Sequence, residues 1–291
     1  MNQRDQIAPV QVRGEDGRVL APFGRRRAVV VSTRKVGAYV LLELADRDGP
    51  QADPGQFHML ATVEHWGAGE DERPFLPRAL SPMGSSGGHL WFMLEDVGPG
   101  THRLTRMKKG EALWVTGPLG NGFTLAGVPA GTPPGAEPPR RQVLVAGGIG
   151  LPPIMALSGA LAARGVPVTL LLGFRDAAHA LVAASFAGAK LATDDGSAGH
   201  HGYVTELLER ELAEAPRAPG SACGPGVMLD AVRELAVARG VPAQLALESG
   251  MACGYGACYG CAVPLVAGGY ARVCVDGPVL EAAALAGVPA A

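Results

Sequence analysis

Between residues 25 and 127 apolar and polar residues alternate in short runs that turn residues separate. The runs are RRAVVVST, AYVLLELA, GQFHMLATV, GHLWFMLEDV and EALWVTG. A period of two is typical of strands with one buried face, and runs at this spacing predict an antiparallel β-barrel or sandwich. The next segment, residues 128–140, is rich in Pro and Gly and is expected to be a linker or an exposed loop.

From residue 141 to 244 the pattern changes to strands that alternate with helices. The apolar run QVLVAG precedes a glycine-rich turn, the helical stretch PPIMALSGALAARG and the run PVTLLLGF. Such alternation predicts a parallel sheet with crossover helices. Residues 245–280 are dense in Gly and Cys, as expected where metal ligation fixes the backbone. The predicted fold is α/β plus all-β, with an N-terminal extension at 1–24 and a C-terminal tail at 281–291.

Composition narrows the classes of partner. Charged residues make up 18% of the 291 residues and the formal net charge is −2, so binding to nucleic acid or to an anionic membrane is not expected. The N-terminus has no apolar stretch of signal-peptide length, and apolar runs elsewhere are too short to span a bilayer. We expect a cytoplasmic protein with small-molecule or protein partners.

Four of the five cysteines lie close together near the C-terminus. The spacing C-x4-C-x2-C-x12-C is formed by Cys253, Cys258, Cys261 and Cys274. Its first three members match the plant-type pattern for a 2Fe-2S cluster, and the glycines between them can turn backbone N–H groups towards the sulfurs. A structural zinc site is the alternative, but zinc sites usually pair two C-x2-C knuckles and this segment has one.

A glycine-rich turn, VLVAGGIGLPP, places Gly147, Gly148 and Gly150 between a strand and a helix. Small residues there let the backbone approach a pyrophosphate, whose charge the helix N-terminus favours. Such a turn can also be only a tight connection. Cys223, in ACGPGVM, is expected either as a plain core residue or beside the nicotinamide.

The chemistry of these two sites requires a third cofactor. A 2Fe-2S cluster takes one electron at a time, whereas a nicotinamide gives two as hydride, so a flavin must mediate between them. In the β-rich half, RALS offers a cation for a diphosphate and a hydroxyl for an isoalloxazine. A surface turn of the same sequence is the alternative for this short motif.

These motifs together resemble the electron-transfer subunits of class 1B dihydroorotate dehydrogenases, within the ferredoxin-NADP reductase superfamily. The resemblance covers residues 25–280, and its carriers in order are PGQF, RALS, VGPGT, GPLGNGF, AGGIGLPP, ATDDGSAGHHGYVT, ACGPGVM, MACGYGACYGCAV and RVCVDGPV. It implies an FAD-binding β-barrel at 25–127, an NAD-binding α/β domain at 141–244 and a cluster-binding segment at 245–280. That segment would face a catalytic subunit that carries FMN.

The resemblance also implies site residues. FAD would be contacted by Arg78, Ala79, Leu80, Ser81, Met93, Leu94, Glu95, Gly100 and Thr101. The nucleotide would lie over residues 147–150 and near Cys223. The sequence departs from the family in RALS, where Ala79 replaces a Pro, and in LESGM, where Ser249 and Gly250 replace an acidic and a basic residue.

The implied function is electron transfer in pyrimidine (UMP) biosynthesis. Electrons from dihydroorotate would pass from FMN on the catalytic subunit through the 2Fe-2S cluster to FAD and on to NAD⁺, in a heterotetramer of two subunits of each kind. We expect NADH rather than NADPH, with Arg175 as the one residue that could accept a 2′-phosphate. No residue for chemistry on the pyrimidine is expected in this chain.

Two alternative functions remain open at this point. The first is a flavin and iron-sulfur reductase subunit that serves another dehydrogenase or an oxygenase. Relatives serving other dehydrogenases tend to have Asp at the position of Cys253, and a plant-type ferredoxin domain needs a longer gap before its last cysteine than this chain has. The second is a zinc-stabilised nucleotide-binding module without catalysis, which would be colourless.

Overall fold

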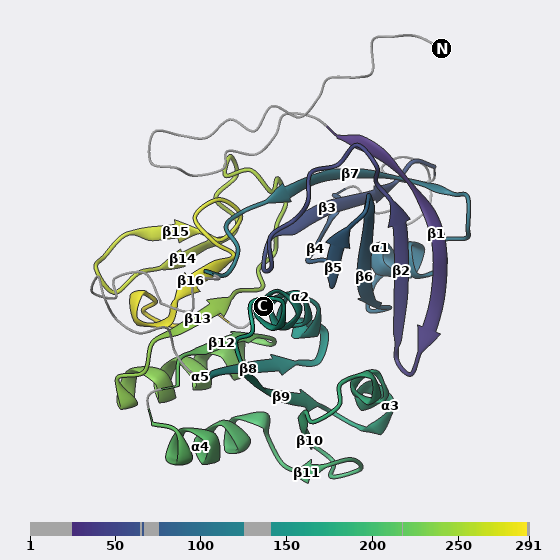
Figure 1. The fold of residues 1–291 in the computed structure, drawn as a ribbon. Helices are drawn as coiled ribbons and strands as arrows, with labels where there is room; N and C mark the ends of the chain where they lie inside the picture. The colour runs from purple at the N-terminus through teal and green to yellow at the C-terminus, as the bar shows by residue number, and fades with distance from the viewer. Residues whose placement is uncertain (1–24, 65, 67–75, 125–140, 217, 290–291) are drawn as a thin grey trace.

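The computed structural model describes residues 25–64, 66, 76–124, 141–216 and 218–289. Within these residues the chain forms two seven-stranded sheets and one two-stranded hairpin (Figure 1). The expected N-terminal extension at 1–24 and linker at 128–140 lie outside the described residues. None of the helices in this described part is long and apolar enough to cross a membrane.

The first sheet is antiparallel and has the order β4-β3-β7-β1-β2-β6-β5. Its strands are β1 (Arg26–Val36), β2 (Tyr39–Ala45), β3 (Phe57–Thr62), β4 (Arg78–Leu80), β5 (Gly84–Ser86), β6 (His89–Glu95) and β7 (Ala112–Leu119). Alternate residues of β2 and β6, such as Leu42 and Phe92, enclose one apolar core. Helix α1 (Pro99–Thr105) packs against β3 and β6. The expected antiparallel β-rich domain is confirmed.

The second sheet has the order β11-β10-β9-β8-β12-β13-β16 and is parallel except for β16. Its strands are β8 (Gln142–Gly147), β9 (Val168–Phe174), β10 (Lys190–Thr193), β11 (His200–His201), β12 (Gly220–Cys223), β13 (Ala243–Ala246) and β16 (Val279–Glu281). The whole of β8 is buried, as expected for a central strand covered on both faces. The predicted parallel α/β domain is confirmed.

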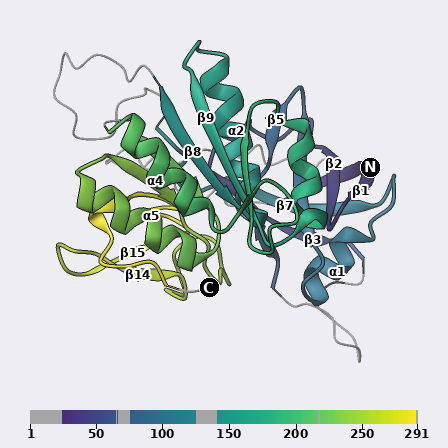
Figure 2. The ribbon, with the colours of Figure 1, turned by 90° about the horizontal axis from the view of Figure 1, so that it is seen from below.

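Helices cover both faces of this second sheet (Figure 2). The helices are α2 (Leu151–Ala162), α3 (Ala177–Ala180), α4 (Val204–Glu214) and α5 (Gly226–Arg239). Prolines at the first turn of α2 favour its start, because no N–H is needed there, and Gly240 ends α5 in the left-handed conformation. Leu151 and Ile154 of α2 share a core cluster with Tyr39 and Met93, so α2 packs between the two sheets.

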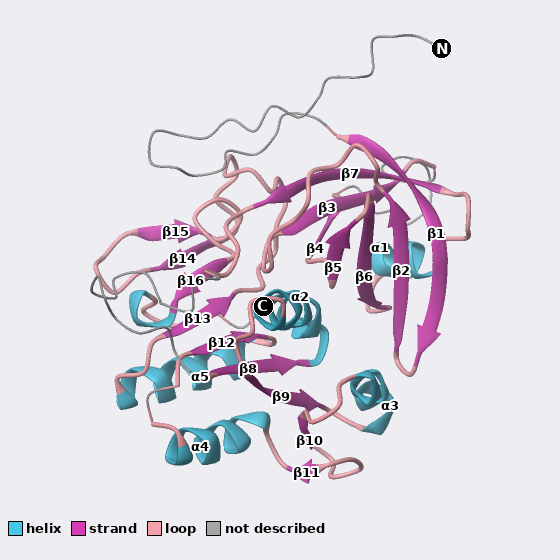
Figure 3. Cartoon of the chain, in the orientation of Figure 1, coloured by secondary structure: helices cyan, strands magenta, loops and turns pink. Residues whose placement is uncertain are grey.

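The segment between β13 and β16 consists mostly of loop, with a hairpin of β14 (Ala262–Pro264) and β15 (Tyr270–Arg272) (Figure 3). The structure differs from the expected tail at 281–291. Glu281 ends β16, and Ala282 and Leu285 are buried in the same core as the second sheet. Residues 281–285 are part of the fold because β16 pairs with β13 at the edge of the second sheet, which brings the chain after it against the core.

A tight connection after β7 joins the barrel to the cysteine segment. The side chain of Asn121 donates hydrogen bonds to the carbonyl oxygens of Val275 and Asp276, at 3.0 Å and 3.1 Å. The N–H of Asn121 donates to Gly277 at 2.6 Å. The motif GPLGNGF therefore fixes the chain that follows Cys274 against the end of the barrel.

Candidate cofactor site

The four predicted cysteine ligands come together as two pairs of thiols. The sulfurs of Cys261 and Cys274 are 3.3 Å apart, and both residues are buried. Cys253 is hydrogen-bonded to the thiol of Cys258, which is exposed. Cys253 is also close enough to Cys274 to affect its pKa. The structure thus places the four thiols in one neighbourhood.

Backbone N–H groups of the loop point at these sulfurs. Burial raises the pKa of the Cys253 thiol, but hydrogen bonds from the N–H groups of Tyr255 and Cys258, from the Cys258 thiol and from the N–H of Ala257 outweigh it and lower the pKa to about 6. For Cys274, burial and the neighbouring Cys261 raise the pKa to about 12, although a hydrogen bond from the N–H of Gly256 lowers it. N–H groups directed at sulfur stabilise the thiolate, which is the form that binds iron.

The pairing of the thiols bears on the choice between zinc and iron. Two pairs of thiols match a cluster with two irons, in which four cysteines are the protein ligands. The donor set and the inward N–H groups therefore fit a 2Fe-2S cluster better than one tetrahedral zinc ion.

The cysteine loop packs directly on the first sheet. A Cβ at Gly254 would lie 2.9 Å from Cγ of Met59 in β3, so only glycine fits there without movement. Met59 pairs in register with Ala79 of β4. The loop that would hold the cluster is therefore one strand away from RALS, the motif predicted to bind the flavin.

Three residues of the predicted FAD site are brought together at the start of α1. A Cβ at Gly100 would lie 2.2 Å from Nε of Arg78, so the guanidinium lies over the first turn of this helix. The hydroxyl of Thr101 accepts hydrogen bonds from the N–H groups of Val97 and Gly98, at 3.0 Å and 3.1 Å. The positive charge of Arg78 at this turn suits a diphosphate.

The other predicted FAD residues lie on β4 and β6. Ala79 packs against the apolar cluster that includes Met59, Cys261 and Cys274, and Leu80 packs against the core of the barrel; Ser81 directly follows β4. Met93 and Leu94 are fully buried, so only their backbone can face a ligand. The carboxylate of Glu95 forms an ion pair with Arg175 of the second domain. Of these residues, Glu95 alone lines the large apolar cavity between the two domains.

That cavity has a volume of about 540 Å³ and lies at the carboxyl ends of the parallel strands. Gly147 and Gly148, both predicted nucleotide contacts, line it beside the end of β9 and the loops after β10 and β12. Ligands of open parallel sheets bind at this edge. The position and the size of the cavity fit a nucleotide.

The remaining predicted nucleotide residues, Gly150 and Cys223, pack against each other. A Cβ at Gly150 would lie 2.3 Å from the carbonyl oxygen of Cys223. Burial, helped by the charge of Glu248, raises the pKa of the Cys223 thiol well above its usual range. Burial also raises the pKa of Glu248 itself. A thiol and a carboxyl group, each with a raised pKa, thus lie near each other beside the glycine-rich turn.

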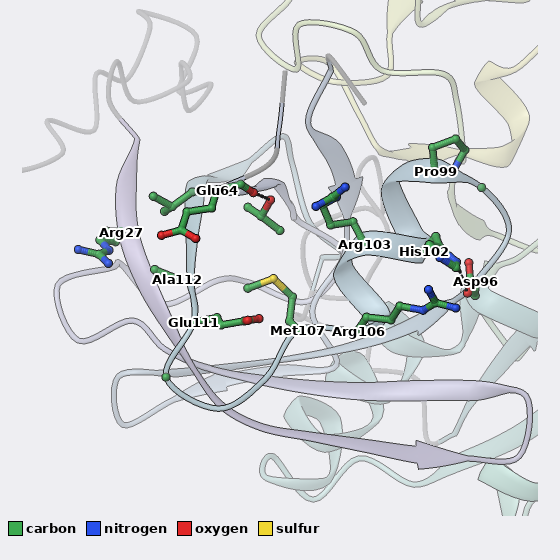
Figure 4. A pocket seen from close by; sticks show the side chains of 14 residues that line it. Arg27, Glu64, Asp96, Pro99, His102, Arg103, Arg106, Met107, Glu111 and Ala112 are labelled. Atoms are coloured by element: carbon green, nitrogen blue, oxygen red, sulfur yellow. Dashed lines mark hydrogen bonds and ion pairs between the residues drawn. The ribbon is translucent and has the colours of Figure 1, made fainter. Parts of the chain in front are cut away.

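A larger hollow, of about 840 Å³, lies beside α1 at the end of the barrel (Figure 4). Arg27, Arg103 and Arg106 face it together with Glu64 and Glu111. None of the predicted site residues lines this hollow in the described part of the chain. Its mixed charges do not select one class of ligand, so the candidate site is the cavity between the domains.

Several residues near the site carry no signal in the sequence. Tyr39 is fully buried, and its hydroxyl has no hydrogen-bond partner among the described residues. Burial raises its pKa above the usual range. His179 also lines the cavity, and the carboxyl group of Glu248 lies near Cys223. A single histidine or glutamate in a helical or loop segment is too common to be noticed.

Comparison with known proteins agrees with these observations. Residues 248–286 match the model of the iron-sulfur cluster binding domain of dihydroorotate dehydrogenase B. The chain is 38% identical over 269 residues to the dihydroorotate dehydrogenase B (NAD(+)) electron transfer subunit of Geobacillus thermodenitrificans, with 89% of this chain and 98% of the relative covered. The subunit of the same name from Bacillus caldolyticus is 37% identical over 267 residues, with the same coverage.

Solved structures agree with the fold. The structure of an NADH-dependent reduced ferredoxin-NADP oxidoreductase has a TM-score of 0.74 at 24% identity and covers 90% of this chain and 91% of that chain. A ferredoxin reductase of carbazole 1,9a-dioxygenase has a TM-score of 0.60 at 23% identity, over 76% of this chain and 67% of that chain. With the fold and the sequence relatives in agreement, the chain belongs to the family of dihydroorotate dehydrogenase B (NAD⁺) electron transfer subunits.

Proposed function

We propose that this chain transfers electrons between the FMN of a dihydroorotate-oxidising subunit and NAD⁺, by way of a 2Fe-2S cluster and FAD that it binds itself. The observation that carries the proposal is the position of the two thiol pairs, Cys253 with Cys258 and Cys261 with Cys274. The loop that holds them packs on β3, the strand that pairs with RALS. Electron transfer falls steeply with distance, so this arrangement suits a relay. The reaction belongs to pyrimidine biosynthesis, in a cytoplasmic complex.

Each part of the chain has its own task in this relay. Bound FAD exchanges hydride with the nicotinamide and single electrons with the cluster. Arg78 would neutralise the FAD diphosphate, and Ser81, which directly follows β4, would lie by the flavin N5. Cys223 is buried against Gly150 of the glycine-rich turn and would lie near the nicotinamide. The cavity with Gly147 and Gly148 receives the dinucleotide.

The partner subunit would dock on the face that carries the cysteine loop. Cys258 is exposed, and the same segment, residues 245–280, carries further large exposed side chains: Tyr255, Tyr259, Val266 and Tyr270. Exposed aromatic side chains are enriched at protein interfaces. A heterotetramer with two copies of each subunit would place one such face on each catalytic subunit.

The test is the cofactor content of the purified chain and of one variant. We expect one FAD and two irons per chain, and we expect NADH to reduce the cluster, as seen by electron paramagnetic resonance. Cys258→Ala should lose the iron but keep FAD and NADH oxidation by dyes, because Cys258 is exposed and its loss leaves the core intact.

Cys223→Ala is the matched control for iron content, because it also removes a cysteine and leaves the thiol pairs untouched. It should keep both irons. Zinc in place of iron in the unmodified chain would refute the proposal. Loss of FAD together with iron in a folded Cys258→Ala variant would refute the assignment of the two cofactors to separate segments.

A further inference from the structure

Three side chains from the two domains meet at the rim of the cavity between them. Glu95, at the end of β6 in the barrel, forms an ion pair with Arg175, which directly follows β9. His179 of α3 lies against both of them. All three line the cavity that also contains Gly147 and Gly148. The contact between the domains is thus part of the proposed nucleotide site.

The position of Arg175 is the one that distinguishes the two nicotinamide nucleotides. In a sheet of this kind the pyrophosphate binds at the glycine-rich turn after the first strand. The residue near the end of the second strand reaches the adenosine ribose, where an acidic side chain suits a 2′-hydroxyl and an arginine suits a 2′-phosphate. By position, β8 is the first strand and β9 the second, so Arg175 by itself would favour NADPH.

The structure shows, however, that one phosphate-binding edge of the Arg175 guanidinium, formed by Nε and Nη2, is already hydrogen-bonded. Nε of Arg175 donates to Nε2 of His179 at 2.9 Å, and Nη2 donates to Oε1 of Glu95. Arginine binds a phosphate through two parallel N–H groups, and these two atoms form one such edge. A 2′-phosphate that bound through this edge would have to displace both partners, and elsewhere on the guanidinium it would still lie near the negative charge of Glu95.

The partners of Arg175 are themselves held in place. Nδ1 of His179 is 2.7 Å from Oδ1 of Asp176, so Nδ1 carries the proton and Nε2 is free to accept from Arg175. The ring of Tyr39 meets the His179 ring edge-on, with centroids 5.5 Å apart. Asp176 also caps α3 by accepting from the N–H of His179 at 3.0 Å. His179 therefore has little freedom to move away from the guanidinium.

We propose that Glu95 is a specificity-determining residue: by holding Arg175, it makes the site select nucleotides with a free 2′-hydroxyl over those with a 2′-phosphate. This inference rests on the proposed function, since it assigns a role within the nucleotide site. It explains how a chain with an arginine at this position can use NADH. The selectivity then depends on a contact between the domains and not on the nucleotide-binding domain alone.

The test compares binding of 5′-AMP and 2′,5′-ADP to the FAD-loaded chain by calorimetry. The unmodified chain should bind 5′-AMP more tightly. Glu95→Ala should shift the ratio of the two Kd values towards 2′,5′-ADP by about tenfold or more, because a charge-assisted pair with phosphate becomes available. Glu95→Gln, which keeps the shape and removes the charge, should shift the ratio in the same direction by less.

Two further variants complete the design. Glu95→Ala combined with Arg175→Ala should lose the gain, since the phosphate then has no guanidinium to bind. Glu43→Gln removes a carboxylate from β2, outside the cavity, and should leave the ratio at its original value. Flavin absorbance and thermal unfolding show whether each variant is folded.

The outcomes separate this inference from the proposed function. Tighter binding of 2′,5′-ADP than of 5′-AMP by the unmodified chain would overturn the inference, and so would an unchanged ratio in folded Glu95→Ala and Glu95→Gln variants. In both cases the chain would still bind a nucleotide, and the electron relay would stand. Failure of the loaded chain to bind 5′-AMP, 2′,5′-ADP or NADH would refute the nucleotide site itself.

Discussion

Both ring nitrogens of His58 are buried inside the first sheet, and neither has a hydrogen-bond partner among the described residues. Burial, and then the charge of Arg26, lower the pKa of His58 from 6.5 to about 3. The folded protein therefore keeps the ring neutral, while the unfolded chain takes up a proton below about pH 6.5. Stability contributed by the neutral ring is lost as the pH falls from about 6.5 towards 3.

A His58→Leu variant should lack this pH dependence. Between pH 7 and pH 5 the free energy of unfolding of the unmodified protein should fall by about 2 kcal/mol more than that of the variant. Urea unfolding of the FAD-loaded chain at the two pH values measures the difference. His102→Leu, at a half-exposed histidine, is the control and should keep the original dependence. Equal pH dependence in His58→Leu and the unmodified protein would contradict the account.

Single residues could be predicted from the sequence where their signal is local. The four cysteines are recognised by spacing within one segment, and the structure brings them together. The family resemblance implies that Glu95 contacts the flavin, but its ion pair joins it to a residue 80 positions further along the chain. Propensity and spacing contain no information on such a contact, because it is formed only when the two domains pack.

At the scale of elements, the connection after β7 holds the cysteine segment through Asn121. Asn121→Asp keeps the shape of the side chain but removes both N–H donors to Val275 and Asp276. We expect the loss to cost about 1–3 kcal/mol of stability in this segment. Iron should therefore be lost to a chelator faster than from the unmodified chain, while FAD absorbance is retained. Iron loss at the original rate would show that this connection does not support the cysteine segment.

The strands of the first sheet and the parallel core of the second were predictable, since period-two patterns and long apolar runs report burial directly. The end of the chain was not. The strand β16 has three residues, too few to show any period, and its neighbour Ala282 is buried in a turn that packs against α5 and β13. The structure of this stretch depends on pairing with a distant strand. Because the local sequence contains no sign of that pairing, residues 281–291 resemble a tail.

For the whole molecule, the two domains and the cysteine segment share their cores. Met59 and Leu119 of the barrel lie in one apolar cluster with Cys261 and Cys274, and this cluster continues into the second sheet. A rigid arrangement keeps the distances between cofactors constant, as a relay of electrons requires. The order of the motifs indicated three parts, but only the structure shows that the cysteine loop touches β3 beside RALS.

The most direct test of the account is coupling to a partner. The chain is mixed with an FMN-containing dihydroorotate dehydrogenase subunit from the same source, dihydroorotate and NAD⁺ are added, and formation of NADH is followed. The unmodified chain should produce NADH, whereas Cys258→Ala should not, although dihydroorotate still reduces the partner's FMN and the variant still oxidises NADH with dyes. Coupling that survives loss of the cluster, or oxidation of dihydroorotate by this chain alone, would contradict the proposed relay.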